Sequence, residues 1–151
     1  MSHSPQVLID AGDAIAVDGI ARQGNVRLRG DAWGVRVRTC RGGRSEGVRV
    51  IEIDNGAMII DVLPTRGMGV WRVRRGDRRL SWSAPAKEPV HPAFVPLMEP
   101  AGLGWLDGFN ELLCRCGLES NGPPEFDAMG RLLRPLHGRI ANTPAHRVGR
   151  S

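Results

Sequence analysis

The sequence has 151 residues, 41% of them hydrophobic, so it is long enough for one domain with a core and too short for two. No apolar run could span a bilayer, and residues 1–13 lack the basic segment and apolar stretch of a secretory signal. The net charge of +5 comes from residues 1–81, with 14 arginines against 9 acidic residues, whereas residues 82–151 are neutral. Three irregularly spaced cysteines fit a reducing compartment, so we expect a cytoplasmic protein.

The first half of the chain shows the two-residue periodicity of β-strands. Residues 1–24 are expected to form a loosely ordered start. Alternation of apolar residues with arginines then predicts half-buried strands, with the arginines facing outward. The alternating residues are Val26 and Leu28 with Arg27 and Arg29, then Val35 and Val37 with Arg36 and Arg38.

Two tight turns are expected to join further strands. Asn55-Gly56 lies between the strand-like segments 48–54 and 57–64, and both residues tolerate the positive φ of a type I′ hairpin turn. Gly76-Asp77 predicts a second hairpin. No helical segment separates these strands, so the sequence predicts an antiparallel sheet and an all-β fold class.

The second half departs from this pattern. Five prolines in residues 83–102 exclude a regular helix, so this segment is expected to be an ordered loop that crosses the sheet. The apolar residues of 105–113 recur at helical spacing, which predicts one helical turn leading into a strand over 112–118. Residues 120–130 form a predicted loop, and 132–145 are expected to contain a strand end, a turn and the start of another strand.

Residues 99–146 form the candidate functional region, because seven glycines there allow close approach of the backbone to a ligand. Within it, His137 is followed by Gly138 and by Arg139, whose guanidinium supplies a fixed set of donors. The alternative for His137 is a hydrogen-bonded structural histidine.

A second group of polar side chains lies in the same region. Glu119, Ser120 and Asn121 offer a carboxylate, a hydroxyl and an amide on one predicted turn. Short polar and charged side chains clustered in this way can bind sugar hydroxyls. The alternative is a solvated turn whose side chains cap its own backbone.

The cysteines and histidines do not predict a metal site. Cys114 and Cys116 would place both sulfurs on one face of a strand, where cysteine is usually a small buried hydrophobe. The histidines at 91, 137 and 146 complete no zinc-ligand spacing, so we expect no metal and no other cofactor. A glycine-rich phosphate loop and the common hydrolase motifs are also absent from the sequence.

The outward arginines leave nucleic-acid binding open as an alternative. A row of them on one sheet face could contact phosphates. The residues concerned are Arg27, Arg29, Arg36, Arg38, Arg72 and Arg74. Aromatic residues are few and tyrosine is absent, whereas base stacking needs aromatic side chains on the same face as the arginines, so a solvated face is favoured.

Four motifs in order resemble one known family over residues 46–147. They are GAMIIDVLPTRGMGVW, SAPAKEPVHPAF, GLGWLDGFNELLCRCGLESNG and PLHGRIANTPAH. Together they are similar to the aldose 1-epimerase-like proteins of the DUF4432 group, in the galactose mutarotase-like superfamily. The resemblance implies a large antiparallel β-sandwich that binds carbohydrate, and relatives that interconvert the α and β anomers of free sugars.

The resemblance also implies a site. Anomerisation needs an acid that protonates the ring oxygen and a base that removes the anomeric proton, for which a histidine and a carboxylate are suited. The Leu-His-Gly histidine of mutarotases matches His137, so we expect His137 to be catalytic and Glu119, Asn121 and Arg139 to bind the substrate. In such domains the carboxylate base comes from a later half, which this sequence does not include.

These observations lead to one hypothesis with two rivals. We expect a single mutarotase-like β-sandwich domain over residues 1–151, a partial one, that binds a monosaccharide or sugar derivative and acts on the anomeric centre if its site is complete. The rivals are a non-catalytic sugar-binding or regulatory module and an arginine-faced nucleic-acid binder. Because a partial sandwich exposes apolar surface and strand edges, we also expect self-association. Because the later half would supply the carboxylate base, we expect anomerase activity near background.

Overall fold

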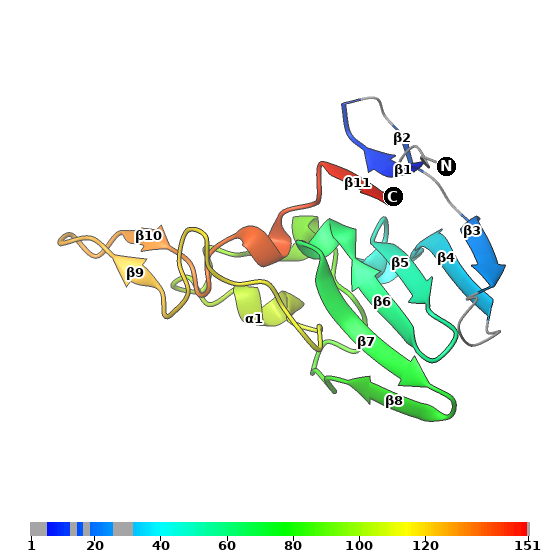
Figure 1. Ribbon diagram of the computed structural model, residues 1–151. Helices are drawn as coiled ribbons and strands as arrows, with labels where there is room; N and C mark the ends of the chain where they lie inside the picture. Colours follow the sequence, from blue (N-terminus) through cyan, green and yellow to red (C-terminus); the bar gives the residue numbers. More distant parts are fainter. Residues whose placement is uncertain (1–5, 13–14, 17–18, 26–31, 151) are drawn as a thin grey trace.

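The computed structural model describes residues 6–12, 15–16, 19–25 and 32–150, and most of its elements are strands in antiparallel sheets (Figure 1). The largest sheet has the sequential strand order β3-β4-β5-β6-β7-β8, a second has the order β11-β1-β2, and β9 pairs with β10. The strands are β1 (Gln6–Asp10), β2 (Ile15–Ala16), β3 (Gly19–Asn25), β4 (Ala32–Thr39), β5 (Arg49–Asp54), β6 (Ile59–Leu63), β7 (Gly69–Arg75), β8 (Arg78–Ser81), β9 (Glu125–Phe126), β10 (Leu132–Arg134) and β11 (Arg147–Arg150).

Helical structure is short throughout the described residues. The one helical turn expected after residue 104 is confirmed as α1 (Trp105–Gly108). The remaining helical segments are 3₁₀ turns, namely η1 (Gly43–Ser45), η2 (Pro64–Arg66), η3 (Pro92–Phe94) and η4 (Ile140–Asn142). In the part of the chain that the structure describes, no helix is long and apolar enough to cross a membrane.

The six-stranded sheet has one apolar face, which the three-stranded sheet covers in part. Val37 of β4 lies opposite Ile51 of β5, and both are buried against Leu8 of β1. Arg36, the neighbour of Val37 along β4, points outward and is exposed, which confirms the predicted alternation in β4. This packing of one antiparallel sheet on another is that of a β-sandwich.

In the described structure, the three-stranded sheet does not cover the apolar face near β8. One row of paired residues crosses the apolar face from β5 through β6 and β7 to β8, and it begins at Ile53 and ends at Leu80. Ile53 is 39% exposed and Leu80 is 62% exposed. The expected self-association of the chain stays a prediction, for which this exposed apolar row supplies a physical basis.

Both predicted hairpins are present, but one turn differs in geometry. Gly76-Asp77 joins β7 to β8 directly. Four residues, 55–58, join β5 to β6, because Asp54 pairs with Ile59. The side chain of Asn55 accepts hydrogen bonds from the amides two and three residues later, at 2.9 and 2.8 Å, and Asn55 does not take a positive φ. The predicted type I′ turn is therefore wrong, because the asparagine side chain closes a longer loop.

Three other predictions need correction or fall outside the described residues. Within the expected loose start, Gln6–Asp10 forms β1, because Leu8 is buried and β1 pairs with β11. The strand predicted over 112–118 is absent, and that segment makes only isolated bridges. Positive φ values at Gly117 and Leu118 bend the chain there. The strand predicted at 26–29 lies outside the described residues.

Candidate functional site

A buried network of charged and polar groups lies where η2, α1 and η4 meet. Arg66, at the end of η2, donates through Nε to Glu111 Oε1 at 2.5 Å. Its Nη1 donates to the carbonyl of Val90 at 3.0 Å and to Asn142 Oδ1 at 2.7 Å. The second carboxylate oxygen of Glu111 accepts from the amide of Asn110 at 3.0 Å. We call the set of Arg66, Glu111, Asn142 and the Val90 carbonyl the Arg66 hub.

The Arg66 hub is a structural element and not an open site. The side chains of Arg66 and Glu111 are both 0% exposed. Its members come from all four segments that carry the family resemblance, so the hub joins those segments in space. A buried ion pair of this kind holds its elements in one geometry, because removing either partner leaves an uncompensated charge in the interior.

His137 lies on a bent segment beside a buried tryptophan. Its φ is 57°, a left-handed value that residues with a Cβ rarely adopt. Its amide donates to the carbonyl of Gly122 at 2.9 Å, and its ring meets Trp105 edge-on at 4.8 Å between centroids. Nδ1 of His137 is buried and has no hydrogen-bond partner among the described residues. The imidazole is therefore held by packing and by its backbone, with one ring nitrogen left unsatisfied.

The structure brings the other predicted site residues to the same region. Glu119 Oε2 lies 3.7 Å from Arg139 Nε in an exposed ion pair. A Cβ built on Gly138 would lie 3.1 Å from the carbonyl of Ser120, so the two segments approach closely there. Asn121 is exposed on the same segment as Glu119. We call Glu119, Asn121, His137 and Arg139 the His137 cluster, and their convergence on one ligand stays a prediction.

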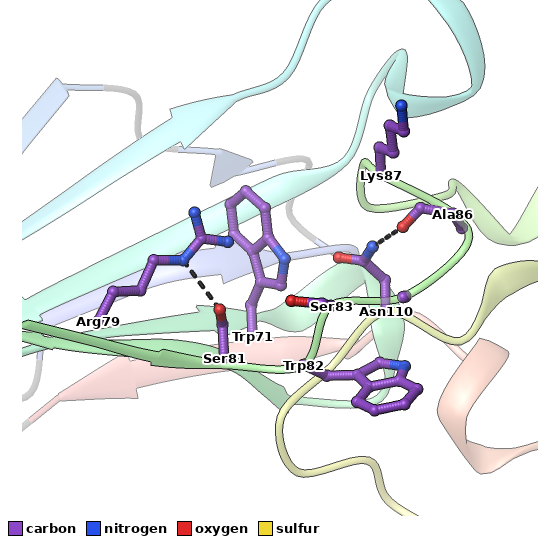
Figure 2. Close-up of a pocket in the computed structure, with 9 residues that line it drawn as sticks. Trp71, Arg79, Ser81, Trp82, Ser83, Ala86, Lys87 and Asn110 are labelled. Atoms are coloured by element: carbon purple, nitrogen blue, oxygen red, sulfur yellow. Dashed lines mark hydrogen bonds between the residues drawn. The ribbon is translucent and has the colours of Figure 1, made fainter.

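A cavity lies apart from the His137 cluster. It has a volume of about 550 Å³ and lies beside β7 and β8. Figure 2 shows Trp71 and Asn110 facing each other across it, with Arg79 beside Trp71 and Lys87 at the opposite side. We call it the Trp82 cavity; its lining residues are Trp71, Arg79, Ser81, Trp82, Ser83, Ala84, Ala86, Lys87 and Asn110.

A row of four rings connects the Trp82 cavity with the His137 cluster. Trp82 stacks on Phe109 with centroids 6.0 Å apart, and Phe109 stacks on Trp105 at 4.7 Å. Trp105 in turn contacts the ring of His137. Trp105 is 4% exposed, and its Nε1 has no hydrogen-bond partner among the described residues. The cavity and the cluster therefore belong to one packed region.

A comparison of the sequence with known protein families identifies the family of this chain. The family DUF4432, a domain of unknown function, matches residues 45–151. This chain belongs to the DUF4432 family. The match covers the Arg66 hub, the His137 cluster and the Trp82 cavity, and it confirms the resemblance drawn from the four motifs.

A solved structure shows the fold of a relative. A crystal structure of a putative aldose 1-epimerase from Klebsiella pneumoniae subsp. pneumoniae is 36% identical to this DUF4432 chain, with a TM-score of 0.83. The similarity covers 97% of this chain and 38% of the other, so the chain spans well under half the length of that relative. The aldose 1-epimerase-like β-sandwich fold is thereby confirmed. A search of curated proteins gave no significant match.

The arginines of the sheet are partly committed to ion pairs within the DUF4432 fold. Arg72 pairs with the buried Asp61, and Arg74 lies 2.6 Å from Glu52 and 3.2 Å from Asp61. The guanidinium of Arg72 also lies over the ring of Trp71, 4.0 Å from its centroid. These two arginines are therefore not the freely solvated side chains that the sequence predicted, because acidic residues of β5 and β6 face them. Arg27 and Arg29 lie outside the described residues.

The surroundings of Cys114, Cys116 and His91 do not indicate a reactive or metal-binding site. Burial, and secondarily the charge of Glu111, raise the pKa of Cys114 to about 12, so this thiol is unreactive at neutral pH. Cys116 is exposed. His91 Nδ1 accepts from the amide of Ala93 at 3.2 Å and caps η3. In the described part of the chain, no three His, Cys, Asp or Glu side chains are placed to hold a metal ion.

Sequence reasoning missed the Arg66 hub and the Trp82 cavity. One signal for the hub was available, because Arg66 follows the apolar run of β6, where a charge needs a buried partner. The partners of Arg66 lie 24 to 76 positions away in the sequence. The cavity had no comparable signal, since it forms where β8 and the following loop meet Asn110.

Proposed function

We propose that this chain binds carbohydrate and acts on the anomeric centre of a free sugar, in the manner of an aldose 1-epimerase. In this proposal His137 transfers the proton, and Glu119, Asn121 and Arg139 contact the sugar. One observation carries the assignment: His137 is held in a left-handed conformation with an unsatisfied buried ring nitrogen, next to an aromatic ring. Strained backbone at a polar residue is typical of functional sites.

The chemistry requires one group that gives a proton and one that takes a proton, and in this proposal His137 supplies one of the two. Ring opening needs a proton on the ring oxygen and loss of the anomeric hydroxyl proton, and closure on the other face reverses both transfers. An imidazole performs such transfers near neutral pH, and its position must be fixed for the transfer to be fast. The contacts of His137 with Trp105 and Gly122 fix that position.

The exposed Glu119–Arg139 pair supplies the polar contacts. A carboxylate accepts hydrogen bonds from sugar hydroxyls, and a guanidinium donates to hydroxyl and ring oxygens. At 3.7 Å the pair is loose, and the two side chains are 41% and 56% exposed, so a sugar can replace their mutual contact at small cost. The exposed amide of Asn121 offers both a donor and an acceptor on the same segment.

Anomer exchange measured by NMR on freshly dissolved galactose and glucose tests the proposal. The proposal predicts that the chain accelerates exchange, in place of the near-background rate expected for a partial sandwich, and that His137→Asn reduces the catalysed rate about 100-fold or more. His146→Asn is the control, because His146 is exposed at the surface and lies outside the cluster. Equal rates for the wild type and His137→Asn would contradict the catalytic assignment.

Binding titrations with sugar and with an oligonucleotide, beside the exchange measurement, distinguish the alternatives. Binding of sugar without acceleration would support a non-catalytic sugar-binding module. Salt-dependent binding of an oligonucleotide without sugar binding would support the nucleic-acid binder. We rank that rival lower because Arg72 and Arg74 already pair with Asp61 and Glu52.

A further inference from the structure

The Trp82 cavity has the size of a small-molecule site. Its volume of about 550 Å³ lies within the range of roughly 300 to 1,000 Å³ that ligand pockets occupy. Strands β7 and β8 form one wall, and the loop that follows β8 forms another (Figure 2). None of the His137 cluster residues lines it.

One buried polar atom in the wall lacks a partner. Asn110 is 3% exposed, and its Nδ2 donates to the carbonyl of Ala86, which fixes the orientation of the amide. Its Oδ1 is buried without a hydrogen-bond partner among the described residues. Figure 2 shows this oxygen directed toward Trp71 and Ser83. A buried acceptor left unpaired costs about 1 to 3 kcal/mol, so a hydroxyl donor from a ligand would be favoured there.

The charge around the cavity has one sign. Arg79 and Lys87 are its two charged lining residues, and no carboxylate is among the described residues that line it. Nε of Arg79 donates to Ser81 Oγ at 2.9 Å, which orients the guanidinium. A guanidinium and an ammonium together favour an oxyanion such as a carboxylate or a phosphate.

The remaining lining groups suit a polyol. Ser81 and Ser83 supply hydroxyls, and Trp82 is 47% exposed, so part of its indole ring is open to contact. An aromatic face packs against the C–H side of a pyranose ring, while hydroxyls and amides bind its edge.

We propose that the Trp82 cavity is a second binding site, which takes an acidic sugar, with Arg79 and Lys87 on the oxyanion and Asn110 and Ser83 on hydroxyls. The oxyanion is inferred from the cavity alone. That the anion is carried by a sugar rests on the proposed function, because it assumes that this chain binds carbohydrate.

The test is an NMR titration that follows the indole N–H signals of the tryptophans. Trp71 and Trp82 report on the cavity, and Trp105 reports on the His137 cluster. The added compounds are glucose 6-phosphate, glucuronate, neutral glucose and inorganic phosphate, each on the full chain. We expect the two acidic sugars to shift Trp71 and Trp82 with at least about tenfold higher affinity than neutral glucose or inorganic phosphate. The tighter of the two acidic sugars identifies the anion as phosphate or carboxylate.

Variants separate this site from the His137 cluster. Arg79→Gln and Lys87→Gln should each weaken acidic-sugar binding about fivefold, and more at low than at high salt. Arg78→Gln is the control, because Arg78 is an exposed arginine of the same strand that does not line the cavity. All three side chains are exposed, so the fold should persist in each variant.

The results for the Trp82 cavity and for His137 can be told apart. Unchanged shifts of Trp71 and Trp82 in His137→Asn, with loss of anomer exchange, would support both proposals. Equal affinity for neutral glucose and glucose 6-phosphate at Trp71 and Trp82 would overturn the acidic-sugar site and leave the function of His137 standing. Equal affinity for inorganic phosphate and glucose 6-phosphate would overturn the sugar part of the inference.

Discussion

Two arginine–glutamate pairs in this molecule have opposite surroundings. Arg66 and Glu111 lie 2.5 Å apart, and neither side chain is exposed. Arg139 and Glu119 lie 3.7 Å apart, and their side chains are 56% and 41% exposed. The first pair is also bonded to a carbonyl, an amide oxygen and a backbone amide, whereas no further side-chain bond joins Glu119 in the described structure.

The difference separates residues that hold the fold from residues available for a ligand. In the Arg66 hub both charged side chains are buried and bonded to each other and to their neighbours, although Arg66 Nη2 and Asn142 Nδ2 have no hydrogen-bond partner among the described residues. We infer that this pair holds the fold of the chain. In the His137 cluster the pair is loose and solvated, and an unsatisfied ring nitrogen lies nearby. The two pairs have the same chemistry, so mutating them in parallel measures what burial contributes.

The largest expected effect is on the buried pair. Glu111→Ala leaves the Arg66 guanidinium buried without its counter-charge, and we expect it to lower the free energy of unfolding by about 3 to 5 kcal/mol. Urea denaturation followed by circular dichroism measures the change. Glu111→Gln keeps an acceptor for Arg66 and should cost less than Glu111→Ala. A loss below about 1 kcal/mol would mean that the hub is not structural.

A second effect concerns the reactivity of the Cys114 thiol. Since burial and the Glu111 carboxylate raise the pKa of Cys114 to about 12, its thiolate fraction at pH 8 is about one in ten thousand. Iodoacetamide should therefore modify the exposed Cys116 at least about 100-fold faster than Cys114. Mass spectrometry of timed samples gives both rates. Similar rates would show that Cys114 does not experience this environment.

A third effect concerns the contact between η2 and η4 next to the hub. Gly67 has a φ of +60°, and a Cβ there would lie 2.2 Å from the carbonyl of Ile140. Gly67→Ala should cost about 2 kcal/mol or more, since it adds a clash with backbone to the strain of a left-handed residue. Gly76→Ala is the control, because Gly76 has a φ of +54° and nothing within 4 Å. Equal losses of stability would rule out the clash.

The smallest stability effect is expected at the exposed pair. Glu119→Ala should change the free energy of unfolding by less than about 1 kcal/mol, because solvent and salt screen the pair. The same substitution should weaken sugar binding, which a calorimetric titration with galactose measures. A loss of stability as large as that of Glu111→Ala would contradict the distinction between the two pairs.

The fold was predictable where local pattern and burial agree. Alternation of Val35 and Val37 with arginines predicted β4, and the turn residues predicted both hairpin positions. The turn at Asn55 was predicted in the wrong type, because its side chain competes with the backbone for hydrogen bonds. The strand at 112–118 failed because Leu118 and its neighbour take positive φ values that the composition does not show.

The candidate site was predictable only in part. His137, Glu119 and Arg139 were selected by residue type and by resemblance, and the structure places them on neighbouring segments. The Arg66 hub and the Trp82 cavity depend on contacts between distant segments. The amide nitrogen of Asn110, for example, donates to the carbonyl of Ala86, 24 positions earlier. This bond fixes the orientation of the amide, in which its oxygen is left unpaired among the described residues. No local pattern carries that information.

The central claim is that the sugar binds at the His137 cluster while the Arg66 hub only holds the fold. The most direct test follows the imidazole signals of His91, His137 and His146 by NMR as galactose or glucose is added. We predict a saturable shift at His137, with His91 and His146 unchanged, and loss of that shift in Glu119→Ala at unchanged stability. A sugar-dependent shift at His91 or His146 with His137 unmoved would contradict the account.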